Sequence, residues 1–405
     1  MKLKTKFCIV FIAIYTFLFF TNLGQFGLLA YLLPFIVINV LSALHRKSCH
    51  MKIEAVDIQL YAIYLVVFYI CTFFNGDEDM GRNSLTIQYL SCIFIFLAIS
   101  YNVPSLQVIK KIINVLAILS LVNCIITVLQ FYNNSIGWGI WTFLNADMLI
   151  EANNQLQNIN SGQEINAGGT FCPGIFPTQV FNGYVLASLG VICACPYPQI
   201  KNWKKLHFIV ATATLIALFC AQQRMAFYIY VLFLAYLFYK KHKIITIFIL
   251  IAALFSYSYI SDIMTAETLG RFANAQDSLR EKLYSSAITY LQENIIVGGR
   301  LAYIQINKLS VHNIFLNAFL YGGIFGGIII LIIYFRMCFK AIRIIIRRNN
   351  QTVSTALAIG LLSYNLISLT HNNSLLTGEP IIWIMYALML MSLKYENEKK
   401  SNIVE

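Results

Sequence analysis

Charge is scarce in this chain of 405 residues: only 11% of them are Asp, Glu, Lys or Arg, whereas 59% are hydrophobic. A soluble globular protein of this size carries about 25% charged residues. Because 14% of the residues are also aromatic, too little polar surface remains to cover a folded body in water. The composition therefore excludes an isolated soluble enzyme, a disordered chain and a fibrous protein. It predicts an all-α polytopic membrane protein.

Several short motifs of catalysis and nucleotide binding are also missing. The chain contains no G-x-x-x-x-G-K-[ST], no H-E-x-x-H and no G-x-S-x-G. It has ten cysteines but no C-x-x-C pair, and most of them lie inside apolar segments. We therefore interpret the cysteines as small buried hydrophobic residues, not as ligands or nucleophiles.

The formal net charge of +12 does not indicate a nucleic-acid partner. The basic residues form short clusters separated by apolar stretches of about 20 residues, which is how loop charges are distributed in a membrane protein. A nucleic-acid binder would show a long basic stripe, and none exists. The lipid bilayer is the partner that this pattern predicts.

Apolar runs predict about twelve transmembrane helices, with both termini in the cytoplasm. Of the 29 Lys and Arg residues, 22 fall on the side of the two termini and 7 on the other side. This asymmetry follows the excess of positive charge in cytoplasmic loops. The expected spans are 7–23, 26–44, 55–74, 85–101, 108–131, 175–195, 206–222, 225–239, 244–260, 313–335, 353–370 and 380–393.

The apolar stretch 206–239 is counted as two spans, although its composition would also fit a single long helix. Such a helix would be about 51 Å long, which exceeds the ~30 Å hydrocarbon core of a bilayer. Lysines at both of its ends must also face the same compartment. We therefore expect the chain to turn back near Gln222, Gln223 and Arg224.

The expected architecture is one integral membrane domain, 1–405, with two long periplasmic loops at 132–174 and 261–311. The other periplasmic loops are short, and the chain shows no internal repeat. Asp57 is the only clear charge inside a predicted span. Ion-coupled transporters usually carry buried carboxylates or histidines at membrane depth, so the pattern disfavours a transporter.

Arginine dominates the few basic residues expected outside the cytoplasm: Arg82, Arg224, Arg271, Arg280 and Arg300. The guanidinium group is a rigid fork that binds phosphate oxygens in pairs. An ion-paired loop surface is the alternative for any one of them. This alternative is least suitable for Arg224, because a charge at the membrane depth expected for that turn has a high free-energy cost.

A second polar feature, His312 and Asn313, lies where the long loop 261–311 enters the next span. A histidine at this point could accept a proton from a sugar hydroxyl near neutral pH. Asn313 could hold that histidine or cap the helix. The glycines that follow at four-residue spacing, 322 with 326 and 323 with 327, let helices approach closely. We interpret these glycines as packing residues.

Chemistry on the outer face requires a substrate that is already activated and delivered there. A lipid diphosphate meets this requirement, because its anionic head suits the arginines and its tail lies in the bilayer. In these features the sequence resembles the bacterial O-antigen polymerase and O-antigen ligase family, membrane glycosyltransferases that use polyprenyl-diphosphate-linked glycans.

Four stretches between about 168 and 335 carry the resemblance. Residues 168–174 resemble the family's Gly-x-Phe-x-x-Pro segment, and residues 222–226 resemble its Ser-Arg-centred turn, with Gln223 in place of serine. The loop 271–299 resembles an Arg-rich loop that ends in Pro-x-x-Gly-x-Gly, with Asn294 in place of proline. His312 and Asn313, followed by Phe-Leu, resemble a His-Asn-x-x-Leu signature.

The resemblance implies a GT-C-like fold and a metal-independent transfer, without a cofactor, at the periplasmic face of the inner membrane. The donor would be a glycan on undecaprenyl diphosphate. Arg224 and Arg280 would bind the leaving diphosphate, and His312 would orient or deprotonate the attacking hydroxyl. Arg271, Asn313 and Arg300 would bind substrate.

Polymerase and ligase differ only in the acceptor, which is another lipid-linked repeat unit or a sugar of the lipid A core. Two long outer loops favour a polymerase, which must hold two glycan chains; a membrane protein that regulates chain length would be a further partner. An O-antigen ligase is the main alternative, and a polysaccharide transporter or flippase is the third. Stacking of Trp138 and Trp141 on sugars is possible in either enzyme, although tryptophans beside a span commonly anchor it at the interface.

This interpretation predicts that residues 224, 280 and 312 face the same compartment. Single-cysteine labelling with a membrane-impermeant thiol reagent, applied to intact spheroplasts, should modify all three positions without permeabilisation. A cysteine at Lys205 is the matched control and should react only after permeabilisation. Lys205 is one of the 22 basic residues that lie on the side of the two termini, which we expect to be cytoplasmic. Placement of the three positions on different sides would contradict the assignment.

Overall fold

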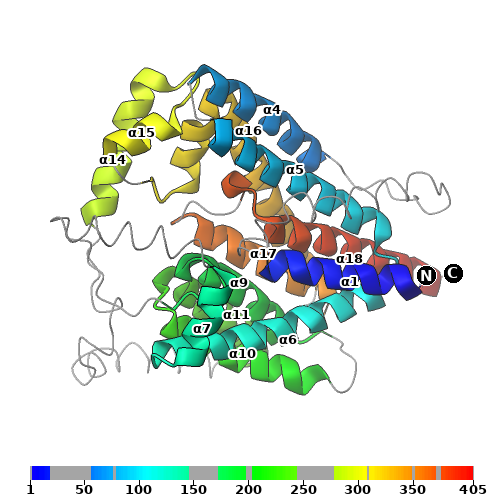
Figure 1. The fold of residues 1–405 in the computed structure, drawn as a ribbon. Helices are drawn as coiled ribbons and strands as arrows, with labels where there is room; N and C mark the ends of the chain where they lie inside the picture. Colours follow the sequence, from blue (N-terminus) through cyan, green and yellow to red (C-terminus); the bar gives the residue numbers. More distant parts are fainter. Residues whose placement is uncertain are drawn as a thin grey trace.

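The computed structural model describes residues 2–18, 56–75, 79–145, 172–197, 203–243, 278–307, 310–348, 352–370 and 375–404. These residues form α-helices and one short 3-10 helix, with no strand among them (Figure 1). The helices are α1 (Lys2–Phe17), α4 (Val56–Phe74), α5 (Asp79–Asn102), α6 (Leu106–Phe131), α7 (Ser135–Leu144), α9 (Gln179–Ala194), α10 (Trp203–Cys220), α11 (Arg224–Lys241), α14 (Ser278–Asn294), α15 (Arg300–Asn307), α16 (Ile314–Arg347), α17 (Val353–Ser368), η2 (Leu375–Thr377) and α18 (Pro380–Val404).

The chain is an all-α membrane protein. Five stretches in the described part of the chain are long and apolar enough to cross a bilayer: α4, α6, α10, α16 and the part of α5 from Leu85 to Asn102. Helices α9 and α17 are equally apolar but shorter. Helices occupy ten of the twelve expected spans, whereas 26–44 and 244–260 lie outside the described residues. The count of twelve therefore stays a prediction.

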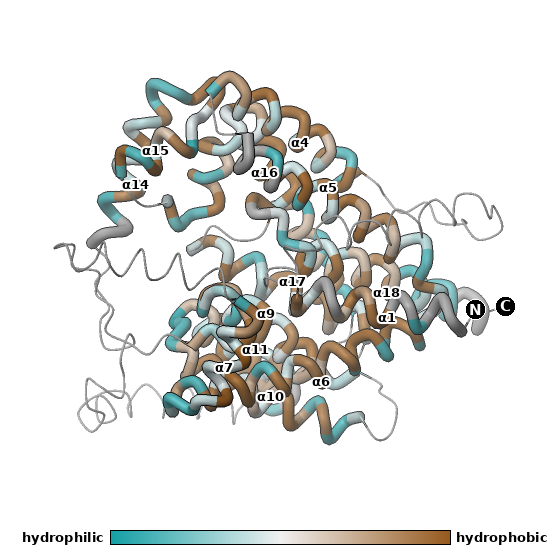
Figure 2. Tube along the Cα trace, viewed as in Figure 1, coloured by the Kyte–Doolittle hydropathy of each residue, from teal (hydrophilic) through white to brown (hydrophobic). Residues whose placement is uncertain are grey.

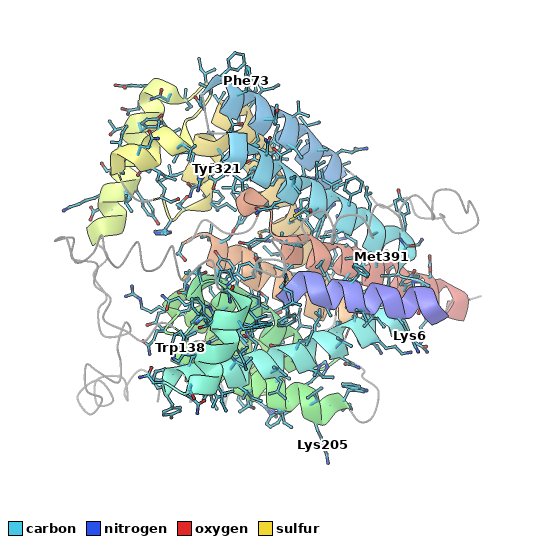
Figure 3. The ribbon with its side chains drawn as sticks, in the orientation of Figure 1. Lys6, Phe73, Trp138, Lys205, Tyr321 and Met391 are labelled. Carbon is cyan, nitrogen blue, oxygen red and sulfur yellow. The ribbon has the colours of Figure 1, made fainter. Side chains whose placement is uncertain are left out.

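The two ends of the chain lie close together at one end of the helix bundle (Figure 1). We call this end the terminal face, and the opposite end, where α7, α14 and α15 lie, the loop face. Lys6 and Lys205 are labelled toward the terminal face, and Trp138 and Tyr321 toward the loop face (Figure 3). Hydrophilic residues are frequent on α14 and α15, whereas hydrophobic ones dominate the long helices (Figure 2). The assignment of the terminal face to the cytoplasm stays a prediction.

Helix α17 forms the centre of the bundle and packs against α9, α11, α16 and α18. Almost every one of its side chains is buried, which is typical of a helix that is hydrophobic all round. It packs tightly on α9 at Gly360, where an added Cβ would lie 2.5 Å from a side-chain carbon of Ile192. Helix α17 is therefore the element against which the surrounding spans are positioned.

The segment before α18 enters the bundle, which the sequence did not predict. The stretch 371–379 was expected to be a short outer loop, but Leu375, Leu376 and Glu379 are buried. The Tyr61 hydroxyl donates to the Leu375 carbonyl at 2.8 Å, and the Tyr89 hydroxyl donates to the Leu376 carbonyl. Because Tyr61 lies about 20 Å along α4 from the end of that helix, the expected surface position is wrong.

A buried ion cluster joins α4, α16 and α18. Asp57 is fully buried and accepts from Lys340 at 2.7 Å and from Arg336 and Tyr386. Both cations were assigned to a cytoplasmic loop after a span ending at residue 335, but α16 continues to Arg347. A helix of 34 residues is longer than the hydrocarbon core of a bilayer, so the end of the membrane span at residue 335 stays a prediction.

Helix α16 bends at Gly322 and Gly323, whose backbone angles are not helical (φ −129° and +58°). The turn between α14 and α15 sits in this bend, and Gly299 N donates to the Leu320 carbonyl at 2.9 Å. A Cβ on Gly323 would overlap the carbonyl oxygen of Ile296. The predicted packing role of the glycines is confirmed, and Gly323 additionally supplies a conformation that other residues rarely adopt.

We expect Gly323→Ala to destabilise the protein by about 1–3 kcal/mol from backbone strain, with a further loss from overlap with the Ile296 carbonyl. A thermal-shift measurement on the detergent-purified protein should show a clear fall in Tm. Gly139→Ala on α7 is the matched control, because no atom lies within 4 Å of its added Cβ. Equal Tm values for the two variants would contradict the bend as drawn.

Candidate functional site

The loop face carries a small second core built by α14, α15 and the beginning of α16. Its buried members are Ala287, Leu291, Tyr303, Val311 and Leu320. Burial raises the pKa of the Tyr303 hydroxyl, and this hydroxyl donates to the Leu283 carbonyl at 2.9 Å. The described part of the long loop 261–311 is therefore a packed helical unit, which we call the α14–α15 unit.

His312 lies between the α14–α15 unit and the bundle, one residue before the N-cap of α16. The Tyr284 hydroxyl of α14 donates to the His312 carbonyl at 3.0 Å. Asn317 Nδ2 donates to the carbonyls of Val311 and Asn313 on either side of it. Three backbone carbonyls in a row are thereby held in place, and the side chain of His312 is only half-buried. The backbone at His312 is therefore held in place, and its side chain is partly accessible.

Asn313 caps α16. Its Oδ1 accepts from the backbone N–H groups of Phe315 and Leu316 at 2.9 and 3.1 Å, which satisfies two donors at the helix N-terminus. Its Nδ2 donates to the Leu369 carbonyl at 3.4 Å, just beyond the end of α17. The predicted capping role is confirmed, and the same side chain also joins α16 to α17.

Arg224 is the first residue of α11 and is half-buried. The chain turns back between Cys220 and Arg224, as predicted, with Gln222 in the left-handed region (φ 53°) and both glutamines buried. The turn packs closely on α9, because an added Cβ on Gly183 would come within 3.1 Å of the Gln223 Cβ. The side chains of Gln222 and Gln223 are thus part of the protein interior, whereas Arg224, at the start of α11, is partly exposed at the end of the bundle.

The structure describes the other predicted arginines to different extents. The Arg300 guanidinium carbon lies 4.7 Å from the centre of the Tyr321 ring, a cation–π contact. Its Nε is buried and has no hydrogen-bond partner among the described residues. Arg280 lies in the first turn of α14, and its side chain lies outside the described part. Arg271 lies outside the described residues entirely.

The structure places the predicted residues on two sides of α17. His312, Asn313 and Arg300 belong to the α14–α15 unit and the first turn of α16. Arg224 belongs to α11, which packs against α9 and α17. Asn313 reaches the end of α17 through Leu369. A substrate that contacts both His312 and Arg224 would therefore lie across the loop-face end of α17.

A buried polar network supports the Arg224 side and was missed by the sequence analysis. Gln130 bonds both the N–H and the carbonyl of Gly174 at 2.8 Å. Asn123 Oδ1 accepts from Ile175 N at 2.9 Å, and its Nδ2 donates to Asn182 at 2.7 Å. Asn123 and Gln130 are seven residues apart in an otherwise apolar span, and this helical spacing is the signal that could have revealed the network.

The two tryptophans of α7 lie beside this polar network. Trp141 is buried and its Nε1 donates to the Phe176 carbonyl at 2.7 Å. Trp138 is half-buried, with its ring edge-on to Trp141 at 6.0 Å. Trp141 therefore holds the turn before α9 in place, and only Trp138 retains a surface that could meet a ligand.

Glu379 is the second residue that the sequence analysis missed. It is 1% exposed and lies near Tyr61, Cys92 and Tyr184, which belong to α4, α5 and α9. Its burial was not expected, because the sequence analysis placed it in a short outer loop between the last two spans. Gly378 and Pro380 flank this residue and made it appear to be part of a surface turn.

No protein-family model matches the chain, and no curated protein matches it. The resemblance to O-antigen polymerases and ligases therefore rests on the four motifs of the sequence. Two of those motifs, the turn at Gln222–Arg224 and the His312–Asn313 pair, lie at helix starts on the loop face.

We expect Asn313→Ala to lose about 1 kcal/mol of stability, because two helix N–H groups lose their acceptor. Asn313→Asp should retain most of it, since the carboxylate still caps and its charge suits a helix N-terminus. Thermal unfolding of the two purified variants beside the wild type tests this difference. Equal losses would show that the Nδ2 contact with Leu369, which both variants lack, outweighs the cap.

Proposed function

We propose that this protein is a membrane glycosyltransferase that joins undecaprenyl-diphosphate-linked oligosaccharide repeat units, as an O-antigen polymerase does. In this proposal the loop face is the periplasmic face of the inner membrane. The acceptor hydroxyl attacks the anomeric carbon of the donor glycan, the bond from that carbon to the diphosphate oxygen breaks, and the lipid diphosphate leaves.

The fixed position of His312 is the observation that carries the proposal. Hydrogen bonds from Tyr284 and Asn317 hold its backbone and the carbonyls beside it, while its side chain remains accessible. A general base must stay within hydrogen-bond reach of the proton it removes, so this rigidity is useful for catalysis. Imidazole also titrates near neutral pH. His312 is thus suited to accept the proton of the attacking hydroxyl.

The arginines supply the charge that a leaving diphosphate requires. Arg224 is positioned at the rim by the buried glutamine turn, and Arg280 and Arg271 belong to the sequence around the α14–α15 unit. Guanidinium groups that are aimed at developing negative charge stabilise the transition state. The Arg300 guanidinium lies over the Tyr321 ring, and the terminal nitrogens of this half-buried side chain would bind an oxygen of the substrate.

The membrane-embedded helices support a lipid-linked substrate. The apolar exteriors of α4, α6, α10 and α16 would keep the polyprenyl tail in the bilayer while its head group reaches the loop face. An O-antigen ligase would use the same donor and the same residues with a lipid A core acceptor, and it remains the main alternative.

A transporter or flippase of lipid-linked glycan is the second candidate, and Glu379 is the observation that favours it. Buried carboxylates at membrane depth are typical of transport pathways, and the sequence analysis had disfavoured transport because Asp57 was the only clear charge inside a predicted span. Glu379→Gln separates the two functions: a transporter that uses this acid should lose transport, whereas a polymerase should retain transfer by a reconstituted protein supplied with substrate on the loop face.

Arg224→Ala, Arg280→Ala and His312→Ala should each abolish glycan transfer while membrane levels stay normal. Arg224→Lys should also fail, because an ammonium group cannot bind two phosphate oxygens as a planar fork does. The measurement is the chain pattern of extracted lipopolysaccharide on a gel, with immunoblotting for protein level. Wild-type patterns in all three alanine variants would overturn the assignment.

The same gel separates the three classes of protein. Loss of a polymerase leaves single repeat units attached to the core, and loss of a ligase leaves none, with long chains accumulating on the carrier lipid. Loss of a flippase leaves repeat units facing the cytoplasm, which a carrier-lipid extraction detects. Lys282→Ala is the matched control, because it removes an exposed cation two residues from Arg280.

A further inference from the structure

The loop-face end of α4 and the turn between α14 and α15 together form an exposed apolar surface. It consists of Phe73 and Phe74, the last residues of α4, and of Ile295 and Ile296, which directly follow α14. We call these four residues the apolar tip. The side chains of Phe74 and Ile296 are 72% and 69% exposed. Phe73 lies on the outer surface of the bundle, at the end of α4 (Figure 3).

A hydrogen bond and a close backbone contact hold the turn at the end of α4. Asn75 directly follows α4, and its Nδ2 donates to the Val297 carbonyl at 3.0 Å. On the inner side, the Ile296 carbonyl packs against Gly323 of α16, where an added Cβ would overlap it. The turn is therefore fixed at the level at which α4 ends, and its two isoleucines lie at the level of the two phenylalanines.

That level coincides with the edge of a bilayer spanned by α4. The helix has 19 residues and is about 28 Å long, which matches the ~30 Å hydrocarbon core. Ile63, Val66 and Ile70 are exposed at spacings of three and four residues, so they form a stripe along one side of α4 that leads to Phe73. A membrane-spanning α4 turns this stripe toward lipid, and the apolar tip continues it.

The backbone of the turn satisfies its polar groups within the protein, as contact with lipid requires. The Val297 carbonyl accepts from Asn75, Gly298 N donates to the Asn294 carbonyl at 2.8 Å, and Gly299 N donates to the Leu320 carbonyl at 2.9 Å. Glu293 is exposed two residues before Ile295. Its carboxylate limits the depth of insertion, because a charge in hydrocarbon has a high free-energy cost.

We propose that the apolar tip is inserted into the bilayer and contacts phospholipid acyl chains in the leaflet at the loop face. The occupant is lipid hydrocarbon, because the four side chains are all apolar and continue the lipid-facing stripe of α4. Part of the loop 261–311, which the sequence analysis placed in the periplasm, is thus a membrane contact. Arg300 begins α15 four residues after Ile296, so the insertion holds it near the lipid head groups. This inference does not rest on the proposed function.

Fluorescence quenching tests the insertion directly. Ile296→Cys and Phe74→Cys are each labelled with bimane in the full-length protein, which is reconstituted in nanodiscs of phosphatidylcholine and phosphatidylglycerol. Ser285→Cys is the matched control, because it is exposed on α14 about 16 Å along the helix from Ile296. Phosphatidylcholine with a nitroxide near the start of one acyl chain should quench positions 296 and 74 at least threefold more than position 285. Aqueous iodide should show the reverse order.

Labelling of the unsubstituted protein gives the background, which should be low because the native cysteines that the structure describes are buried or half-buried. A charged residue in the tip provides a second test. With bimane at position 296, Ile295→Asp should raise quenching by iodide at least threefold and lower quenching by the lipid nitroxide. Ile288→Asp places the same charge at an exposed isoleucine of α14 outside the tip and should change neither.

Two results would overturn the proposal. Equal quenching of positions 296, 74 and 285 by iodide would show that the tip lies in water. Protection of position 296 from both quenchers would show that a second copy of the chain or another protein covers it. Neither result bears on the proposed glycan transfer, because quenching is measured without a glycan substrate and none of these variants changes His312, Arg224 or Arg280.

Discussion

The contact between the Ile296 carbonyl and Gly323 is the constraint on which the loop face depends. Because Gly323 has no Cβ, the turn between α14 and α15 can sit directly on the bent backbone of α16. The bend separates the first turns of α16 from its long membrane-crossing part. Gly299 and Arg300 thereby contact the first turns of α16, which His312 precedes in the sequence.

The second organising principle is that polar groups inside this bundle are matched to one another. Each would be costly in an apolar surrounding, because neither lipid nor apolar side chains replace the hydrogen bonds of water. Asp57 has three partners on α16 and α18, and Asn123 and Gln130 hold the turn before α9. These matched groups fix the relative positions of helices that apolar packing alone would let slide.

The candidate site likewise contains two kinds of polar residue, which differ in whether their polar atoms are used within the protein. Residues that hold the backbone, such as Tyr284, Asn317 and Asn313, use their polar atoms within the protein. Residues proposed for chemistry, His312 and Arg224, are half-buried at the rim. A transferase needs both sets, since the reacting groups must be accessible and yet must not move.

Composition and charge distribution by themselves determined that this is an all-α membrane protein, because the apolar content of the long segments leaves no soluble alternative. They also placed the turn at Gln222–Arg224, since a lipid bilayer limits the length of a span. The cap at Asn313 followed from the local preference of helix N-termini. Each of these results depends on neighbouring residues or on the thickness of the bilayer.

Tertiary structure alone decided which polar groups are buried. Asp57 is bonded to Arg336, which is 279 positions away in the sequence, and the segment before Glu379 is held by tyrosine hydroxyls of α4 and α5. The bend at Gly323 depends on a turn that precedes it in the sequence and packs onto it in space. No local pattern encodes such partners, because the free energy of a buried polar group is set by what the fold places beside it.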